Sequence, residues 1–228
     1  MSINHIQNWA QSKDGQDIEL YTSAHFLTSE TQNKILFIGG MHGDEPAGVE
    51  LAKNLLKWLQ STVEKKEHLK FTIEWALIPC INPDGYLKNQ RTNANGVDLN
   101  RNFPSLSWTP QEEKNRYYPG SSAASEAETQ ALVELIQNVN LKTIIHFHSW
   151  KPCIVKTGED PLEISLLLHA ASGYNIVETI GYDTPGSLSQ YAGIDRQITV
   201  ICTEENDDEP IQSTWDRWGP GLKKIFYV

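Results

Sequence analysis

Apolar, β-branched runs alternate with segments of helical period along this 228-residue chain, and this alternation limits its possible folds. Residues 34–40, 71–79, 143–149 and 197–204 are predicted strands with few polar interruptions. Continuous apolar runs are typical of strands in parallel sheets whose two faces are both covered. We therefore expect one α/β domain spanning residues 1–228, with a mostly parallel, mixed and twisted sheet flanked by helices on both faces.

Three segments carry the helical period that such a sheet requires. Residues 46–60 begin with a proline, which suits a first helical turn because its missing N–H would have no partner there. Residues 125–137 open with Ser125 and Glu128, the spacing of a capping box. Residues 162–172 form the third predicted helix. Between the second strand and the second helix lies a long polar segment, residues 80–120, and loops this long in compact domains are usually functional.

The composition argues against two classes of partner. The chain has 19 basic and 29 acidic residues, a formal net charge of −10, whereas a nucleic acid or an anionic membrane requires a basic face. The sequence shows no secretory signal and no apolar run of about twenty residues. Cys80, Cys153 and Cys202 lack CxxC spacing and are interpreted as free thiols of a reducing compartment. We expect a cytoplasmic protein; its oligomeric state is not indicated.

A histidine and a glutamate three residues apart follow the first predicted strand. His42 and Glu45 lie in a glycine-bearing turn between that strand and the proline-led helix. An imidazole nitrogen and a carboxylate oxygen are half of a His₂Glu catalytic zinc set, in which water is the fourth ligand. An isolated HxxE pair is more often a pair of surface residues than a set of metal ligands. The interpretation as metal ligands therefore depends on the position of His42 and Glu45 between a predicted strand and a predicted helix.

The third ligand would have to come from a distant part of the chain. His146 and His148 both lie on the predicted strand 143–149 and share one face by two-residue alternation. His148 is nearer the end of the strand, but spacing alone favours it only slightly, so both stay candidates. The remaining histidines lie in segments without other site features: His5, His25, His68 and His169.

Several motifs in a fixed order resemble the zinc carboxypeptidase A family. They are His42-Gly43-Asp44-Glu45, Asn82-Pro83-Asp84-Gly85, Arg91, Asn100-Arg101, His148-Ser149-Trp150 and Glu204, and they extend from about residue 35 to residue 205. The resemblance implies a zinc carboxypeptidase-like fold and one Zn²⁺ per chain, with His148 rather than His146 as third ligand. It also implies that Glu204 is the general base for the attacking water and that Arg91 stabilises the developing oxyanion.

The same resemblance suggests residues that bind the substrate. Asn100 and Arg101 match a pair that clamps a terminal carboxylate, although loop-ordering hydrogen bonds are the alternative. Tyr182 lies roughly where the family has a mobile tyrosine, with a spacing that differs by about one residue; packing is its alternative role. Glu205 is expected to face away from Glu204 and to reach solvent.

Residues 91–104, 119–132 and 181–187 resemble one bacterial branch of the family, the murein peptide amidases. That branch cleaves the γ-D-glutamyl–meso-diaminopimelate bond, which implies a small murein tripeptide-like partner. A second hypothesis is an N-acyl amino acid hydrolase of the aspartoacylase or succinylglutamate desuccinylase type, which shares the HxxE turn. The Asn82-Pro83-Asp84-Gly85 motif favours the peptidase. A third hypothesis, an inactive binding protein for cell-wall fragments, is disfavoured because no ligand or base is missing.

Overall fold

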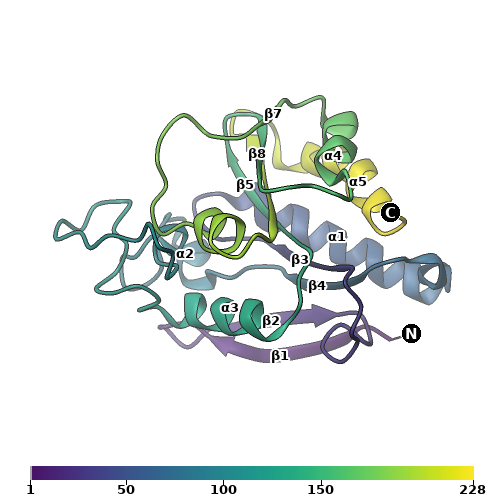
Figure 1. The fold of residues 1–228 in the computed structure, drawn as a ribbon, viewed down its shortest axis with the longest axis horizontal. Helices are drawn as coiled ribbons and strands as arrows, with labels where there is room; N and C mark the ends of the chain where they lie inside the picture. Colours follow the sequence, from purple (N-terminus) through teal and green to yellow (C-terminus); the bar gives the residue numbers. More distant parts are fainter. Residues whose placement is uncertain (1) are drawn as a thin grey trace.

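An eight-stranded sheet forms the centre of the structure (Figure 1). The computed structural model describes residues 2–228. In spatial order the strands run β1-β2-β4-β3-β5-β8-β6-β7. Their bounds are β1 Asn4–Gln11, β2 Asp17–Thr22, β3 Lys34–Ile38, β4 Glu74–Ile78, β5 Thr143–Trp150, β6 Cys153–Thr157, β7 Ile176–Val177 and β8 Thr199–Asn206. The four central strands β4, β3, β5 and β8 are mutually parallel, whereas β1, β2 and β6 add antiparallel pairs. The expected mixed, mostly parallel sheet is confirmed.

Helices cover both faces of this sheet, as predicted. They are α1 Pro46–Glu64, α2 Pro83–Lys88, α3 Ala127–Asn138, α4 Ile164–Ser172 and α5 Thr214–Ile225. One apolar core joins the sheet to α3, which lies beside β1 and β2 in Figure 1. The other core joins the opposite face to α1, α4 and α5. Alternate residues of β3 divide between the two cores, because Leu36 packs in the first and Phe37 in the second.

The capping box predicted at Ser125 and Glu128 is wrong. Helix α3 begins at Ala127, and the residue before it makes no capping hydrogen bond. The Ser125 hydroxyl instead donates to Glu126 Oε1 at 2.6 Å. The Glu128 carboxylate is buried and accepts from Asn93 Nδ2 at 3.3 Å. Both side chains make hydrogen bonds outside the first turn of α3, so the spacing of Ser125 and Glu128 in the sequence was not enough to predict a cap.

The polar segment 80–120 is more ordered than the predicted loop. It contains α2, whose first turn is capped by Asn82 Oδ1 accepting from the Gly85 N–H at 2.9 Å. It also contains a 3₁₀ turn, Leu99–Arg101, where Asp98 Oδ1 accepts from the Asn100 N–H at 2.9 Å. The asparagines and aspartates of this segment therefore replace the backbone partners that a strand or helix would provide.

The four parallel strands end at the same edge of the sheet, and polar residues gather there. In the register of β5 and β8, His148 is the partner of Glu204, while His146 of β5 pairs with Ile38 at the end of β3. Open α/β sheets bind ligands beyond the carboxyl ends of their strands.

In the part of the chain that the structure describes, no helix has the length and apolar character needed to span a bilayer.

Candidate metal centre

The turn between β3 and α1 holds His42 and Glu45 in buried positions. It is pressed against the turn that opens α2, because a β-carbon on Gly43 would overlap the backbone of Gly85. A glycine at this point allows the two backbones to touch. Helix α1 packs in a similar way on β5, since a β-carbon on Gly48 would overlap the carbonyl of Phe147. These contacts bring the HxxE turn next to the end of β5.

His42, Glu45 and His148 direct their polar atoms at one point. Glu45 Oε1 lies 2.7 Å from His42 Nδ1, and Glu45 Oε2 lies 2.7 Å from His148 Nδ1. The two Nδ1 atoms are 3.1 Å apart. Ligand atoms about 2.0–2.1 Å from a tetrahedral zinc ion lie about 3.3 Å from one another. The three side chains therefore fit a zinc ion in both chemistry and spacing.

The Nε2 atoms of His42 and His148, which lie on the side of each ring away from Glu45, have hydrogen-bond partners of their own. His42 Nε2 lies 3.1 Å from Asp98 Oδ1, and His148 Nε2 lies 2.9 Å from His146 Nδ1. Metal-binding histidines usually donate their second N–H to such an acceptor, which fixes the tautomer. The arrangement leaves Nδ1 of both rings available to a cation. Asp98 had no predicted role, and His146 had been considered only as a possible third ligand, because only the tertiary fold brings the two side chains to these nitrogens.

The charges around His42 favour a cation at this point. Burial alone would lower the pKa of His42, but the carboxylates of Glu45 and Asp98 outweigh it and raise the pKa to about 9. Burial would likewise raise the pKa of Glu45, yet the two neighbouring histidines hold it well below its ordinary value. A proton on His42 thus compensates the negative charge that a metal ion would otherwise neutralise.

Glu204 stands beside these ligand atoms with few partners of its own. Its side chain is 8% exposed at the end of β8. Within residues 2–228 its hydrogen-bond partner is the Cys202 thiol, which donates to Oε1 over 3.3 Å. Burial, with a further contribution from the charge of Glu45, raises the pKa of Glu204 to about 8. A divalent cation nearby would lower this pKa, because it favours the ionised carboxyl.

Glu205 faces the opposite side of β8, as alternation predicts, but the expectation that it reaches solvent is wrong. It is 3% exposed and accepts from Tyr174 Oη at 2.6 Å and Trp218 Nε1 at 2.9 Å. Arg217 Nε donates to it at 3.2 Å. Helix α5, which the sequence did not reveal, supplies Arg217 and Trp218 and closes this face.

A cavity of about 360 Å³ opens over the ligand atoms. All eight site residues predicted from the sequence line it: His42, Glu45, Arg91, Asn100, Arg101, His148, Tyr182 and Glu204. A larger hollow of about 730 Å³ lies elsewhere, between Lys142 and Thr199 at the amino-terminal ends of β5 and β8. We assign the candidate catalytic site to the smaller cavity, because it is lined by the titratable side chains that lie close together, those of His42, Glu45, His148 and Glu204.

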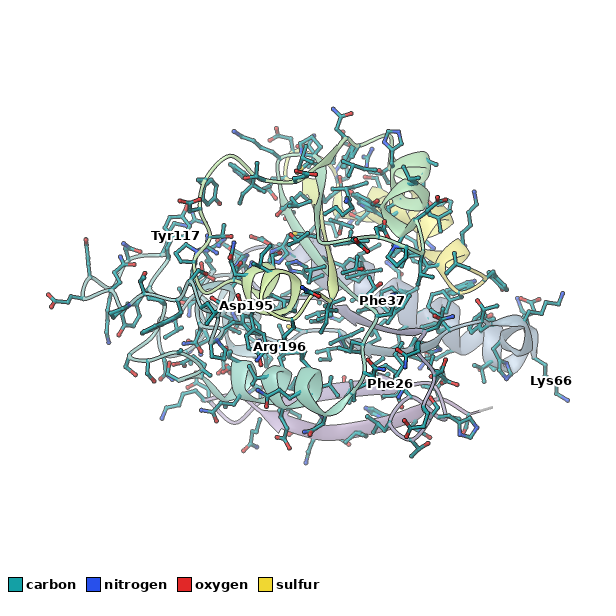
Figure 2. The ribbon with its side chains drawn as sticks, in the orientation of Figure 1. Phe26, Phe37, Lys66, Tyr117, Asp195 and Arg196 are labelled. Carbon is teal, nitrogen blue, oxygen red and sulfur yellow. The ribbon has the colours of Figure 1, made fainter. Side chains whose placement is uncertain are left out.

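Arginines form one wall of the cavity. Arg91 donates through Nε to Asp98 at 2.9 Å and through Nη1 to Glu45 at 3.3 Å. Arg101 donates to the Asn100 carbonyl at 2.6 Å. The Tyr117 ring lies 5.2 Å from the Arg91 guanidinium and 5.7 Å from that of Arg101. Tyr117 is on the loop side of the molecule, away from the core residue Phe37 (Figure 2).

Tyr182 lies at the mouth of the cavity. Its side chain is 46% exposed and its ring packs edge-on against Trp150, with centroids 6.0 Å apart. A second cavity of about 350 Å³ adjoins the first and shares Arg101, Tyr117 and Tyr182 with it. Its other lining residues include Thr109, Gln111 and Asp183. Asp183 lies within the segment 181–187 that resembles the murein peptide amidases, whereas no motif indicated Thr109 or Gln111.

Comparisons with known proteins agree with this geometry. The family model described as zinc carboxypeptidase matches residues 2–180. Murein peptide amidase A of Escherichia coli K12 is 34% identical over 182 residues, covering 74% of this chain and 69% of that protein. The solved murein-tripeptide amidase of Escherichia coli O157 superposes with a TM-score of 0.78 at 24% identity, over 100% of this chain and 93% of the other. Carboxypeptidase A of Helicoverpa armigera gives 0.77 at 17% identity, over 98% and 67%. The expected zinc carboxypeptidase-like fold is confirmed.

Proposed function

The chain belongs to the zinc carboxypeptidase family, and on that premise we propose that His42, Glu45 and His148 hold one catalytic Zn²⁺. The observation that carries the proposal is the convergence of two Nδ1 atoms and the Glu45 carboxylate at one buried point. Zinc also suits the donor types, because two imidazoles and a carboxylate leave a fourth position for water or substrate. The protein is a hydrolase of this family.

Glu204 is the proposed general base. When bound, zinc supplies a Lewis acid that polarises the scissile carbonyl and lowers the pKa of water to about 7. Glu204 would accept a proton from the attacking water at a carboxylate oxygen and later deliver it to the leaving amine nitrogen. Its sparse hydrogen bonding supports this role, since a carboxylate held by several donors is a poor proton acceptor.

Arg91, Asn100 and Arg101 are the proposed substrate contacts. The Arg91 guanidinium is held by Asp98 and Glu45, so its charge stays fixed where negative charge would develop on the carbonyl oxygen. The guanidinium of Arg101 can bind a terminal carboxylate through two parallel hydrogen bonds. Tyr182 would close over the bound substrate from the mouth of the cavity.

The proposed substrate is a murein tripeptide-like molecule, cleaved at the γ-D-glutamyl–meso-diaminopimelate bond. The 34% identity with murein peptide amidase A supports this choice. So does the adjoining cavity, where Asp183, Thr109 and Gln111 provide polar groups beyond Arg101. The side chain of diaminopimelate ends in an amine, which could bind to Asp183, and a carboxylate, which could accept from Thr109 and Gln111.

A substrate panel tests this proposal directly. The panel pairs L-Ala-γ-D-Glu-meso-diaminopimelate with the same peptide ending in lysine, which lacks only the second carboxylate. We expect kcat/KM to favour diaminopimelate by at least about tenfold, the selectivity of roughly one charged hydrogen bond. Preference for N-acetyl-aspartate or succinyl-glutamate would instead support an N-acyl amino acid hydrolase.

The Asp183→Asn variant refines the panel. It should raise KM for the diaminopimelate peptide and leave an alanine-terminated peptide unchanged, since alanine does not reach the second cavity. Equal effects on both peptides would contradict a binding role for this cavity.

We further propose that the protein works in the cytoplasm. Cys80, Cys153 and Cys202 are all free, which is the usual state in a reducing compartment. Fractionation of cells that produce the tagged full chain tests this, with a cytoplasmic marker enzyme as the control.

A further inference from the structure

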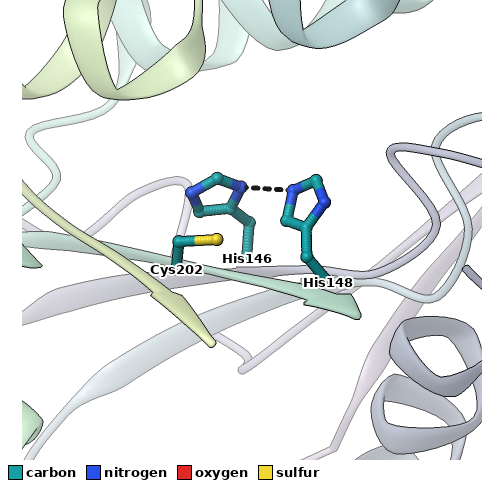
Figure 3. Close-up of side chains that lie close together, drawn as sticks. All are labelled: His146, His148 and Cys202. Carbon is teal, nitrogen blue, oxygen red and sulfur yellow. Dashed lines mark hydrogen bonds between the residues drawn. The ribbon is translucent and has the colours of Figure 1, made fainter. Parts of the chain in front are cut away.

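His146 is a buried histidine next to the metal centre that the proposed mechanism does not use. Its side chain is 2% exposed, and its Nδ1 lies 2.9 Å from Nε2 of His148. Figure 3 shows the two rings joined by this contact, and their planes cross at 88° with centroids 4.7 Å apart. Among the described residues, His146 Nε2 has no hydrogen-bond partner.

The proton positions in this pair follow from the proposed ligand set. His148 directs Nδ1 at Glu45 and at His42, so a cation there requires Nδ1 to be unprotonated. The proton of the neutral His148 ring then lies on Nε2, and this N–H points at His146 Nδ1. His146 must therefore accept at Nδ1 and carry its own proton on Nε2.

We propose that His146 is a positioning residue, which accepts the Nε2–H of His148 and so fixes the tautomer and ring orientation that present Nδ1 to zinc. This inference rests on the proposed function. Asp98 has the equivalent place behind His42. The two supports differ in charge, because Asp98 is a carboxylate paired with Arg91 whereas His146 is a ring that accepts without adding a negative charge.

The uncharged acceptor suits its surroundings. Glu45 Oε2 lies 2.7 Å from His148 Nδ1 and Glu204 is the β8 register partner of His148, and the repulsion from Glu45 contributes to the raised pKa of Glu204. A third carboxylate at position 146 would add a buried like charge to that pair. An imidazole supplies the same hydrogen-bond acceptor without this repulsion.

The same residues could be interpreted as a second metal site, because donor atoms of His146, His148 and Cys202 lie within 4.8 Å of one another. Two of those donors are already engaged. His148 Nε2 is bound to His146, and the Cys202 thiol donates to Glu204. A second ion would have to break both contacts, so the geometry favours the positioning role.

A pair of substitutions separates this role from simple packing. His146→Asn keeps an acceptor oxygen near the place of Nδ1, and His146→Leu fills similar space without an acceptor. We expect His146→Leu to weaken zinc binding by about 10–100-fold and His146→Asn to stay within about threefold of wild type. Competition with a chromophoric chelator measures the zinc dissociation constant. The visible bands of the Co²⁺-loaded protein should shift in the leucine variant only.

Thermal melts of the metal-free proteins provide the control. A positioning role predicts a smaller zinc-induced rise in Tm for His146→Leu, with similar metal-free Tm values for both variants. If the leucine variant does not fold, His146→Ala takes its place in the same comparison. Wild-type zinc affinity in the variant without an acceptor, or equal losses in both variants, would overturn the inference. Failure of the wild-type protein to bind zinc would instead overturn the proposed function.

Discussion

Glu204 and Glu205 are neighbours on strand β8, and they occupy opposite faces of the sheet with opposite surroundings. Both are buried, at 8% and 3% exposure. Glu205 accepts from a tyrosine hydroxyl, an indole N–H and an arginine. Glu204 receives one long contact from a thiol, and its pKa is raised to about 8 by burial and the charge of Glu45.

The difference between these two faces lies in hydrogen bonding rather than in burial. Donors that fully occupy a buried carboxylate stabilise its charge and hold it in place, so it contributes to stability. A buried carboxylate with free acceptor positions beside a metal centre can take up and release a proton. A glutamate side chain thus has a structural role at position 205 and a proposed catalytic role at position 204.

Removal of zinc is expected to have the largest effect on activity. It acts on the face of the sheet that carries Glu204 and leaves the hydrogen bonds of Glu205 in place. Dialysis against a chelator should abolish hydrolysis and lower Tm, because a ligand that binds the native state stabilises it. Added zinc should restore both. Full activity in protein that metal analysis shows to be metal-free would contradict the proposed centre.

Glu204→Gln should be the next most damaging change. We expect kcat to fall by about 10²–10⁴-fold, the usual contribution of a general base, while the bound zinc stays near one ion per chain. Steady-state kinetics and metal analysis of the same sample measure both quantities. Turnover near the wild-type rate would assign the proton transfer to another group.

Glu205→Gln is the matched control, with the same chemical change one residue along. It should lower the free energy of unfolding by about 1–3 kcal/mol, because the Arg217 and Tyr174 contacts lose their charged acceptor. The kcat value should stay within about threefold of wild type. Urea unfolding monitored by circular dichroism gives the stability. A large loss of kcat with unchanged stability would reverse the assignment of the two faces.

Glu128 tests whether a raised pKa alone marks a catalytic carboxyl. Burial raises its pKa from 4.5 to about 7, although it accepts from Asn93 and is not among the residues that line the cavity over the ligand atoms. Between about pH 4.5 and 7 the folded state therefore holds more protons than the unfolded state, so stability falls as pH rises through this window.

The Glu128→Gln variant should remove that part of the pH dependence and leave kcat unchanged. Urea unfolding across pH 5 to 8 measures the slope. An unchanged slope would mean that a group other than Glu128 causes the pH dependence of stability. A large fall in kcat would mean that Glu128 also contributes to catalysis. This is the smallest of the expected effects.

Local patterns in the sequence account for the central strands and for the HxxE turn. The apolar run before His42 and the two-residue alternation around His148 are properties of a few neighbouring residues. Glu205 could not be assigned in this way, because its partners come from α5. That helix contains Pro220, which weakens the helical signal of its sequence. The partners of His42 and His148, namely Asp98 and His146, depend on side-chain contacts that only the folded chain defines.

The contact between Gly43 and Gly85 has a consequence for protein engineering. The HxxE turn and the turn that opens α2 touch backbone to backbone, with no room for a side chain between them. A loop exchange that transfers only one of these turns would force the other to move, and Glu45 and Arg91 would separate with it. The two segments, about forty residues apart in the chain, are therefore one exchangeable part and should be transplanted together.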